Sequence, residues 1–333
     1  MEASWKENGN PDYTHLRKTL FYSIQNNAPS SSTTEDTKSH ENVNPEDFLR
    51  APWCSLVVDW VIAVFGSAKP VSGFPSHVRL RTGTMNDPVL IEVCVDSVAS
   101  AMAAERGGAG RIEVCSGLIE GGVTPGSGLI EAVRARVSIA VHVMIRPRGG
   151  DFCYDADEFR IMRRDIENAK GMGVDGVVFG LLDPQGNVDV ARTQELVEWA
   201  RPLKVTFHRA FDMTADLFRA LEDVCAAGAD RILTSGGEQT CWQGVKTVAR
   251  LVLAAGDRIV VMAGSGIKPG NVRRILEQTG AREIHVGLRS RVPSPMVHRN
   301  SRVSMGTIEG REYERSVVLE ESVRQLSHAA RGE

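Results

Sequence analysis

From residue 88 onward, short apolar runs alternate with longer segments that carry apolar residues at helical spacing. Four runs share a phrase in which one glycine precedes a β-rich stretch and another follows it: GAGRIEVCSG from Gly108, GVDGVVFG from Gly173, GADRILTSG from Gly228 and GAREIHVG from Gly280. Each gap between copies has room for a helix, a strand and a second helix. The other predicted strands are VLIEVC from Val89, IAVHVMIR from Ile139, LKVTFHRA from Leu203 and RIVVMAGSG from Arg258.

The pattern therefore predicts eight strands separated by helices. The clearest helices are expected at 157–171, 189–200, 214–227, 243–255 and 271–278. Eight such units over about 250 residues are typical of an α/β protein with a (β/α)8 TIM-type barrel. An open doubly wound sheet is the alternative. It is less well supported, because no Gly-x-Gly-x-x-Gly follows the first strand and the repeat contains no topological switch.

The two ends of the chain differ from this regular part. Residues 1–50 are polar and rich in Ser, Thr, Asn and Glu, so we expect them to be disordered. An apolar run at 52–68 is shorter than the ~20 residues of a membrane span, and a linker is expected at 69–87. The predicted organisation is an N-terminal extension at 1–87 and a barrel domain at 88–333. The domain ends with a long loop at 291–306 and a C-terminal helix at 312–330.

Composition narrows the function. The chain is 42% hydrophobic and 24% charged, with a net charge of −3, which is ordinary for a soluble globular protein. The charge has no basic excess, so we expect neither nucleic acid nor membrane as a partner. Six cysteines form no Cys-x-x-Cys pair or zinc-finger spacing, which predicts a reducing, cytoplasmic location, with the nucleus as an alternative.

The first two strands each contain the tripeptide Glu-Val-Cys, at Glu92–Cys94 and Glu113–Cys115. Side chains alternate along a strand, so each glutamate and its cysteine share a face. If the two strands are neighbours with Cys94 and Cys115 in register, the sulfur atoms come close together. Two thiolates suit Cu(I), and Met144 on the third strand adds a thioether. The commoner role of a free cysteine is that of a small buried apolar side chain.

Barrel ligands bind at the C-terminal ends of the strands, where further polar residues are expected. The Arg146–Phe152 loop has two arginines and two glycines, which suit phosphate or carboxylate binding. His208 is followed by a cation, Arg209, and a carboxylate, Asp212, and the turn at Gly264–Gly266 is similar to phosphate-binding loops.

These strand ends favour an alternative function, a barrel enzyme acting on a small anionic, phosphorylated or sugar-like metabolite. The catalytic candidates are Glu92, Glu113, Arg146, His208 and Asp212. The ligand-binding candidates are Arg148, Arg209, Ser235, Gly264 and Gly266.

Five segments together resemble the CutC family of copper homeostasis proteins, over about residues 88 to 333: IEVCVDSVASAMAAERGGAGRIEVCSGLIEGGVTPG, MIRPRGGDFCY, GVDGVVFGLL, VTFHRAFDM and RILTSG. The resemblance implies a TIM-type barrel, a cytoplasmic copper-handling role and self-association as a dimer or tetramer. It also implies that Cys94 and Cys115 are the Cu(I) ligands. The rim residues that match the family are Glu92, Glu113, Arg146, His208 and Asp212. The family's Gly-Gly-Gly-Ile after the seventh strand is Gly264-Ser265-Gly266-Ile267 here.

Overall fold

The computed structural model describes residues 89–305 and 310–333. The expectations for the extension at 1–87, including the apolar run and the linker, lie outside these residues. Every helix in the described ranges is too short or too polar to cross a bilayer.

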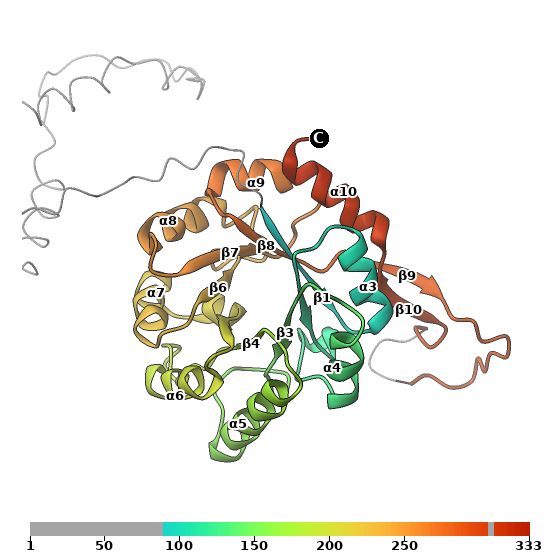
Figure 1. Cartoon of the computed structure of the whole chain (residues 1–333), viewed down its shortest axis with the longest axis horizontal. Coiled ribbons are helices and arrows are strands. Elements are labelled where there is room, and N and C mark those ends of the chain that lie inside the picture. Colours follow the sequence, from blue (N-terminus) through green and yellow to red (C-terminus); the bar gives the residue numbers. More distant parts are fainter. Residues whose placement is uncertain (1–88, 306–309) are drawn as a thin grey trace, which may run out of the picture. The chain divides into compact units, whose positions relative to one another are not determined.

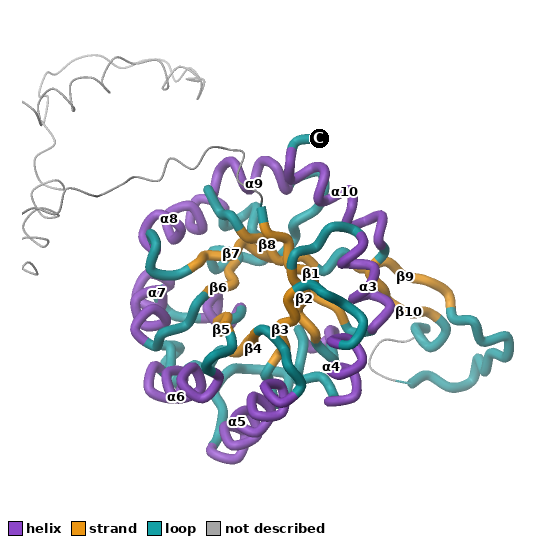
Figure 2. Tube along the Cα trace, in the orientation of Figure 1, coloured by secondary structure: helices purple, strands orange, loops and turns teal. Residues whose placement is uncertain are grey.

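Within these ranges, eight parallel strands close into a barrel in chain order, with helices around the outside (Figures 1 and 2). The strands are β1 (Leu90–Val95), β2 (Arg111–Val114), β3 (Ala140–Met144), β4 (Gly176–Phe179), β5 (Lys204–Phe207), β6 (Arg231–Thr234), β7 (Val260–Gly264) and β8 (Glu283–Val286). Strand β8 pairs with β1, which closes the ring. The TIM-type barrel is confirmed, and the open doubly wound sheet is wrong.

The outer helices are α3 (Val98–Arg106), α4 (Ser127–Arg134), α5 (Ala156–Gly171), α6 (Val190–Ala200), α7 (Leu217–Ala226), α8 (Val245–Ala255) and α9 (Val272–Thr279). Two 3-10 turns, η2 (Leu118–Glu120) and η3 (Arg209–Met213), lie in the loops after β2 and β5. Helices α5 and α6 have aspartate caps, since Asp155 accepts from Glu158 N and Asp189 accepts from Arg192 N. Helix α7 starts at Leu217 rather than residue 214, because η3 precedes it and Asp216 provides the cap.

Side chains alternate along each strand, so some point outward to the helices and the others point into the barrel. On β1, Ile91 and Val93 belong to the main apolar core between the strands and the helices. Glu92 and Cys94 point the other way and are also buried, at 0% and 8% exposure. Closing the sheet turns this second face into the inside of the barrel. Charged side chains on it are therefore enclosed by protein.

The C-terminal tail differs from the prediction. The expected helix at 312–330 begins only at residue 320, as α10 (Glu320–Arg331), and the expected loop at 291–306 starts within a strand. Strand β9 (Arg289–Pro293) pairs antiparallel with β10 (Glu314–Val318) to form a hairpin beside α3 (Figure 1). Val318 is buried and its N–H bonds to Ser100 Oγ, so the chain stays extended there. Glu320 and Glu321 then favour a helix start.

Helix α10 packs on α3 and α9, and Gly107 marks the tightest point of this contact. A Cβ built on Gly107 would lie 2.5 Å from Val323 Cβ and 2.7 Å from the Glu320 carbonyl oxygen. Gly107 has φ −76°, which any residue can adopt, so only the space around it demands glycine.

We predict that Gly107→Ala destabilises the fold by about 1–3 kcal/mol, because the added methyl group forces α10 away from α3. Gly171→Ala is the matched control, since nothing lies within 4 Å of a Cβ at that helical position. The control should be neutral or slightly stabilising. Urea unfolding of the two variants measures the difference, and equal midpoints would contradict the packing argument.

Candidate functional site

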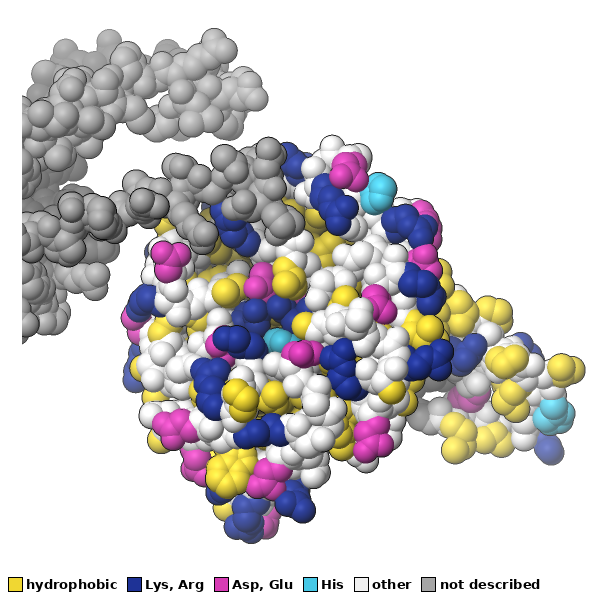
Figure 3. Space-filling model, viewed as in Figure 1, with side chains coloured by type: hydrophobic (Ala, Val, Ile, Leu, Met, Phe, Trp, Pro, Cys, Tyr) yellow, Lys and Arg dark blue, Asp and Glu magenta, His cyan; other side chains and the backbone are white. Residues whose placement is uncertain are grey.

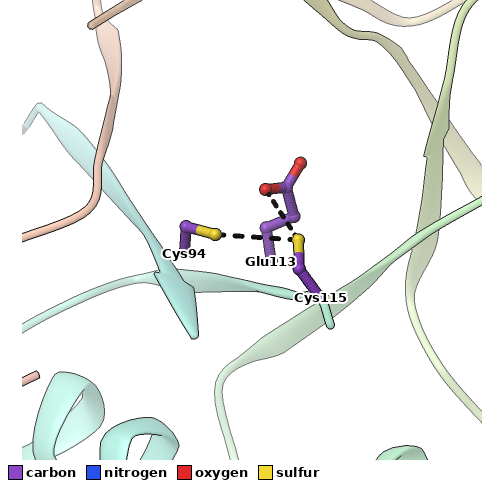
Figure 4. Close-up of side chains that lie close together, drawn as sticks. All are labelled: Cys94, Glu113 and Cys115. Atoms are coloured by element: carbon purple, nitrogen blue, oxygen red, sulfur yellow. Dashed lines mark hydrogen bonds between the residues drawn. The ribbon is translucent and has the colours of Figure 1, made fainter. Parts of the chain in front are cut away.

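The thiols of Cys94, on β1, and Cys115, directly after β2, lie side by side inside the barrel. The sulfur atoms of Cys94 and Cys115 are 3.6 Å apart, and the Cys115 thiol donates to Glu113 Oε2 at 3.3 Å (Figure 4). The cross-strand partner of Cys94 is Glu113, so the cysteines are offset by two residues rather than in register. The strand tilt in a barrel brings such diagonal neighbours into contact. Two thiols and one carboxylate therefore meet at one point.

A small apolar cluster surrounds the thiols. Met144 and Val178 pack against Cys94 and Cys115, apart from the main core. Met144, expected as a third sulfur donor, thus packs against both cysteines, and its role as a ligand stays a prediction. Gly122 covers the cluster in a left-handed conformation, φ 94°, and a Cβ there would lie 3.4 Å from Cys115 Sγ and 3.5 Å from Met144 Cε. These separations would allow a Cβ, so it is the left-handed backbone conformation that favours glycine at this position.

The two sulfurs differ in acidity. The hydrogen bond with Cys115 lowers the pKa of Cys94 to about 5, and His285 adds to this effect against the opposing effect of burial. The same hydrogen bond and burial raise the pKa of Cys115 well above its usual value. Cys94 therefore carries a negative charge at neutral pH, and the thiolate is the form that binds metals.

Glu113 and His285 adjoin the thiols. Burial raises the pKa of Glu113 to about 8, and its Oε1 has no hydrogen-bond partner among the described residues. His285 Nε2 lies 3.8 Å from Glu113 Oε2, and its Nδ1 is 2.7 Å from Glu92 Oε1. Burial lowers the pKa of His285, but the two carboxylates outweigh it and hold the pKa well above 6.5.

Glu92 is fully buried and stays ionised. Burial raises its pKa, but Arg111 and His285 more than offset this and hold the pKa well below its usual range. Arg111 donates to Glu92 through Nε and to Glu283 Oε2 at 2.5 Å. Arg231 reaches the same Glu283 at 2.5 Å and 3.0 Å. Alternating charges thus form one network across the inside of the barrel.

His142 lies beside this network, 3.9 Å from Glu92 Oε2. Burial lowers its pKa to about 4, so it is neutral at pH 7. On the barrel face drawn in Figure 3, basic, acidic and histidine side chains gather at the centre of the ring of helices. The barrel therefore has a polar, charge-balanced centre in place of the usual apolar filling.

Arg146 and His208 are both buried at the strand ends. Arg146 donates to the carbonyl oxygens of Glu120 at 2.6 Å and Gly150 at 2.7 Å, which ties two loops together. Burial and Arg146 lower the pKa of His208 to about 3. His208 Nδ1 accepts from Ala210 N at 3.2 Å, so the hydrogen of the neutral ring is on Nε2. That nitrogen contacts no acceptor in the described part of the chain.

The Arg209, Asp212 and Ser235 side chains meet between β5 and β6. Arg209 donates to Asp212 Oδ2 at 2.7 Å and to Ser235 Oγ at 2.7 Å. Asp212 also accepts from Thr234 Oγ1 and from Gly237 N. The carboxylate orders the loop after β6, and its proposed catalytic role stays a prediction.

The other ligand-binding candidates lie apart from the thiols or have structural contacts. Arg148 pairs with Glu158 at the start of α5. A Cβ at Gly264 would lie 2.5 Å from Leu233 Cδ1, and one at Gly266, where φ is 69°, would lie 2.9 Å from Thr240. At Gly266 the positive φ and the crowded Cβ position both favour glycine, whereas at Gly264 a Cβ would have to displace the end of the Leu233 side chain. The roles of both glycines in ligand binding stay predictions.

Sequence reasoning did not select the residues that complete the polar centre: Arg111, His142, Arg231, Glu283 and His285. The repeated phrases contain the information that could have identified three of them. Arg111, Arg231 and Glu283 each precede by two residues a position expected to face the inside of the barrel. Strand alternation therefore places them inside too, one layer deeper.

Comparison with known proteins identifies the chain's relatives. A family model described as the CutC family matches residues 89–290. A mouse copper homeostasis protein cutC homolog is 50% identical over 243 residues, which cover 73% of this chain and 89% of that protein. The chain belongs to the CutC family. A CutC family protein of Chromobacterium violaceum is 46% identical over 240 residues, covering 72% of this chain and 97% of that protein.

The barrel of this CutC-family chain also resembles a solved structure. The crystal structure of the putative copper homeostasis protein CutC from Streptococcus agalactiae has a TM-score of 0.56 and 32% sequence identity. It covers 59% of this chain and 97% of the other chain. The family expected from the five sequence segments is confirmed.

We predict that Arg111→Met destabilises the barrel by about 3–5 kcal/mol, because the buried Glu92 and Glu283 lose the guanidinium between them. Arg164→Met on α5 removes an arginine from an exposed pair with Glu167. This control should change stability by at most about 0.5 kcal/mol. Chemical denaturation of both variants tests the network, and a loss below about 1 kcal/mol for Arg111→Met would contradict it.

We predict that His208→Asn weakens the acid sensitivity of the fold. The asparagine oxygen can still accept from Ala210 N, but the titrating ring is gone. The pKa of His208 falls from 6.5 when unfolded to about 3 when folded. The unfolded chain therefore binds the extra proton, and stability present above pH 6.5 is lost as the pH falls towards 3.

The free energy of unfolding of the parent and of His208→Asn is measured by urea denaturation at pH 6.5 and at pH 5.0. The stability difference between parent and His208→Asn should shrink by about 1.5 kcal/mol over this interval. His298→Asn, at an exposed position, is the control and should keep the pH profile of the parent. Parallel profiles for the parent and His208→Asn would argue against a neutral, buried His208.

Proposed function

We propose that this chain is a cytoplasmic copper homeostasis protein that binds Cu(I) through Cys94 and Cys115. The observation that carries the proposal is the 3.6 Å separation of the two sulfur atoms inside the barrel. Its CutC-family relatives in mouse and human are named as copper homeostasis protein homologs. Copper is the cargo in this proposal, and the two thiolates are its ligands.

The surroundings suit a soft, monovalent ion. Cu(I) prefers thiolate and thioether ligands, and Met144 packs against both cysteines. Cys94 is already acidic, so one thiolate is available without loss of a proton at neutral pH. Cys94 is 8% exposed and Cys115 is fully buried, so an arriving ion meets Cys94 first.

The alternative, an enzyme acting on a small anion, has less support in the geometry. It needs arginines that can clamp an anion. Arg148 pairs with Glu158 and Asp151, and Arg209 pairs with Asp212. Arg146 donates to loop carbonyl oxygens. Self-association as a dimer or tetramer stays a prediction from the family.

An anaerobic Cu(I) competition titration tests the copper proposal. Cys94→Ser and Cys115→Ser should each weaken Cu(I) binding by at least about tenfold, because a hydroxyl is a poor ligand for a soft ion. Cys225→Ser is the matched control, since that free thiol lies on α7, away from the site. Equal affinity in the parent and all three variants would overturn the proposal.

A further inference from the structure

We propose that the site around Cys94 and Cys115 also holds a Zn²⁺ ion. Its four ligands would be Cys94 Sγ, Cys115 Sγ, a Glu113 carboxylate oxygen and His285 Nε2. This site shares its thiols with the proposed copper site but does not depend on copper binding. It adds a carboxylate and an imidazole, which are donors that Zn²⁺ accepts and that Cu(I) does not need.

Three of the separations between donor atoms fit one tetrahedral ion. Zn–S bonds of about 2.3 Å and Zn–N or Zn–O bonds of about 2.0–2.1 Å place tetrahedral ligand atoms roughly 3.3–3.8 Å apart. The observed separations are 3.3 Å from Cys115 Sγ to Glu113 Oε2, 3.6 Å between the sulfurs and 3.8 Å from Glu113 Oε2 to His285 Nε2. Three of the six pairs of donor atoms therefore already have separations of this size.

Glu113 links two groups of donors. The donor atoms of Cys94, Glu113 and Cys115 lie within 4.8 Å of one another, and those of Glu92, Glu113 and His285 form a second such group. Glu113 is 2% exposed, and its Oε1 has no partner within the described residues. A buried carboxylate oxygen without a hydrogen bond is costly, and a cation beside it removes that cost.

The orientation of the His285 ring also suits a zinc ligand. Its Nδ1 lies 2.7 Å from Glu92 Oε1, and Arg111 holds Glu92 ionised from the other side. When Nδ1 donates to this carboxylate and Zn²⁺ displaces the proton of Nε2, the lone pair of Nε2 is directed to the side of Glu113. In most zinc sites, a histidine that binds the metal through one ring nitrogen donates a hydrogen bond to a carboxylate through the other. Glu92 is therefore a positioning residue.

Substitutions of Glu113 and His285 can distinguish Zn²⁺ binding from Cu(I) binding, because only the zinc site uses these two residues. Glu113→Gln preserves the shape of the side chain but removes its charge. His285→Asn keeps a hydrogen-bond donor in the place of Nδ1 and removes Nε2. Both variants should lower Zn²⁺ affinity at least tenfold and leave Cu(I) affinity within about twofold of the parent. The cysteine-to-serine variants should impair both metals.

The experiment uses the full, reduced chain, titrated with Zn²⁺ against a chromophoric chelator. The parent should bind one Zn²⁺ per chain. Its X-ray absorption spectrum should show two sulfur ligands at about 2.3 Å and two nitrogen or oxygen ligands at about 2.0–2.1 Å. Cys225→Ser and His328→Asn, both away from the site, are controls that should bind like the parent.

Three results would overturn the zinc site: no stoichiometric Zn²⁺ binding by the parent, a spectrum without two sulfur ligands, or parent-like affinity in both Glu113→Gln and His285→Asn. The spectrum of the parent decides the question even where a variant fails to fold. Failure of the two proposals can be told apart. Cu(I) binding without Zn²⁺ binding rejects only the zinc site. Zn²⁺ binding with Cu(I) affinity independent of both cysteines rejects only the copper site.

Discussion

The buried ion pair between Glu92 and Arg111 is the contact on which the rest of the site depends. A carboxylate with no exposed surface can stay ionised only where cations and hydrogen-bond donors replace water. Arg111 does this from the neighbouring strand and also binds Glu283, which in turn binds Arg231. The ionised Glu92 then accepts from His285 and fixes the direction of its ring. A barrel filled with apolar side chains has no means to do this.

Two glutamates one strand apart thus have opposite properties. Glu92 lies against Arg111, and its pKa is held below the usual range. Arg111 pairs with Glu92 and Glu283 rather than with Glu113, and burial raises the pKa of Glu113 to about 8. The same repeated tripeptide provides both, so the difference comes entirely from what each side chain meets inside the barrel. Pairs of carboxylates driven apart in this way are frequent at functional sites.

Much of the fold was predictable because glycine-bounded strands and capped helices leave local signals. The eight strands followed from spacing, and alternation placed each glutamate and its cysteine on one face of the strand. The register was not predictable, because barrel tilt sets which residues pair, and Cys94 lies opposite Glu113. The β9–β10 hairpin was missed, since its stability comes from long-range pairing. The ion network was missed for a similar reason: Arg111 and Glu283 are 172 residues apart in sequence.

The site therefore brings two kinds of metal-binding side chain together inside the barrel. The sulfurs of Cys94, Cys115 and Met144 form a soft, apolar side under the backbone of Gly122. Glu113 and His285 form a harder side that rests on the Glu92–Arg111 pair. A soft monovalent ion needs only the first side, and a borderline divalent ion uses both. Because Cys115 bonds to Glu113, the two sides meet at the atoms that the metals share.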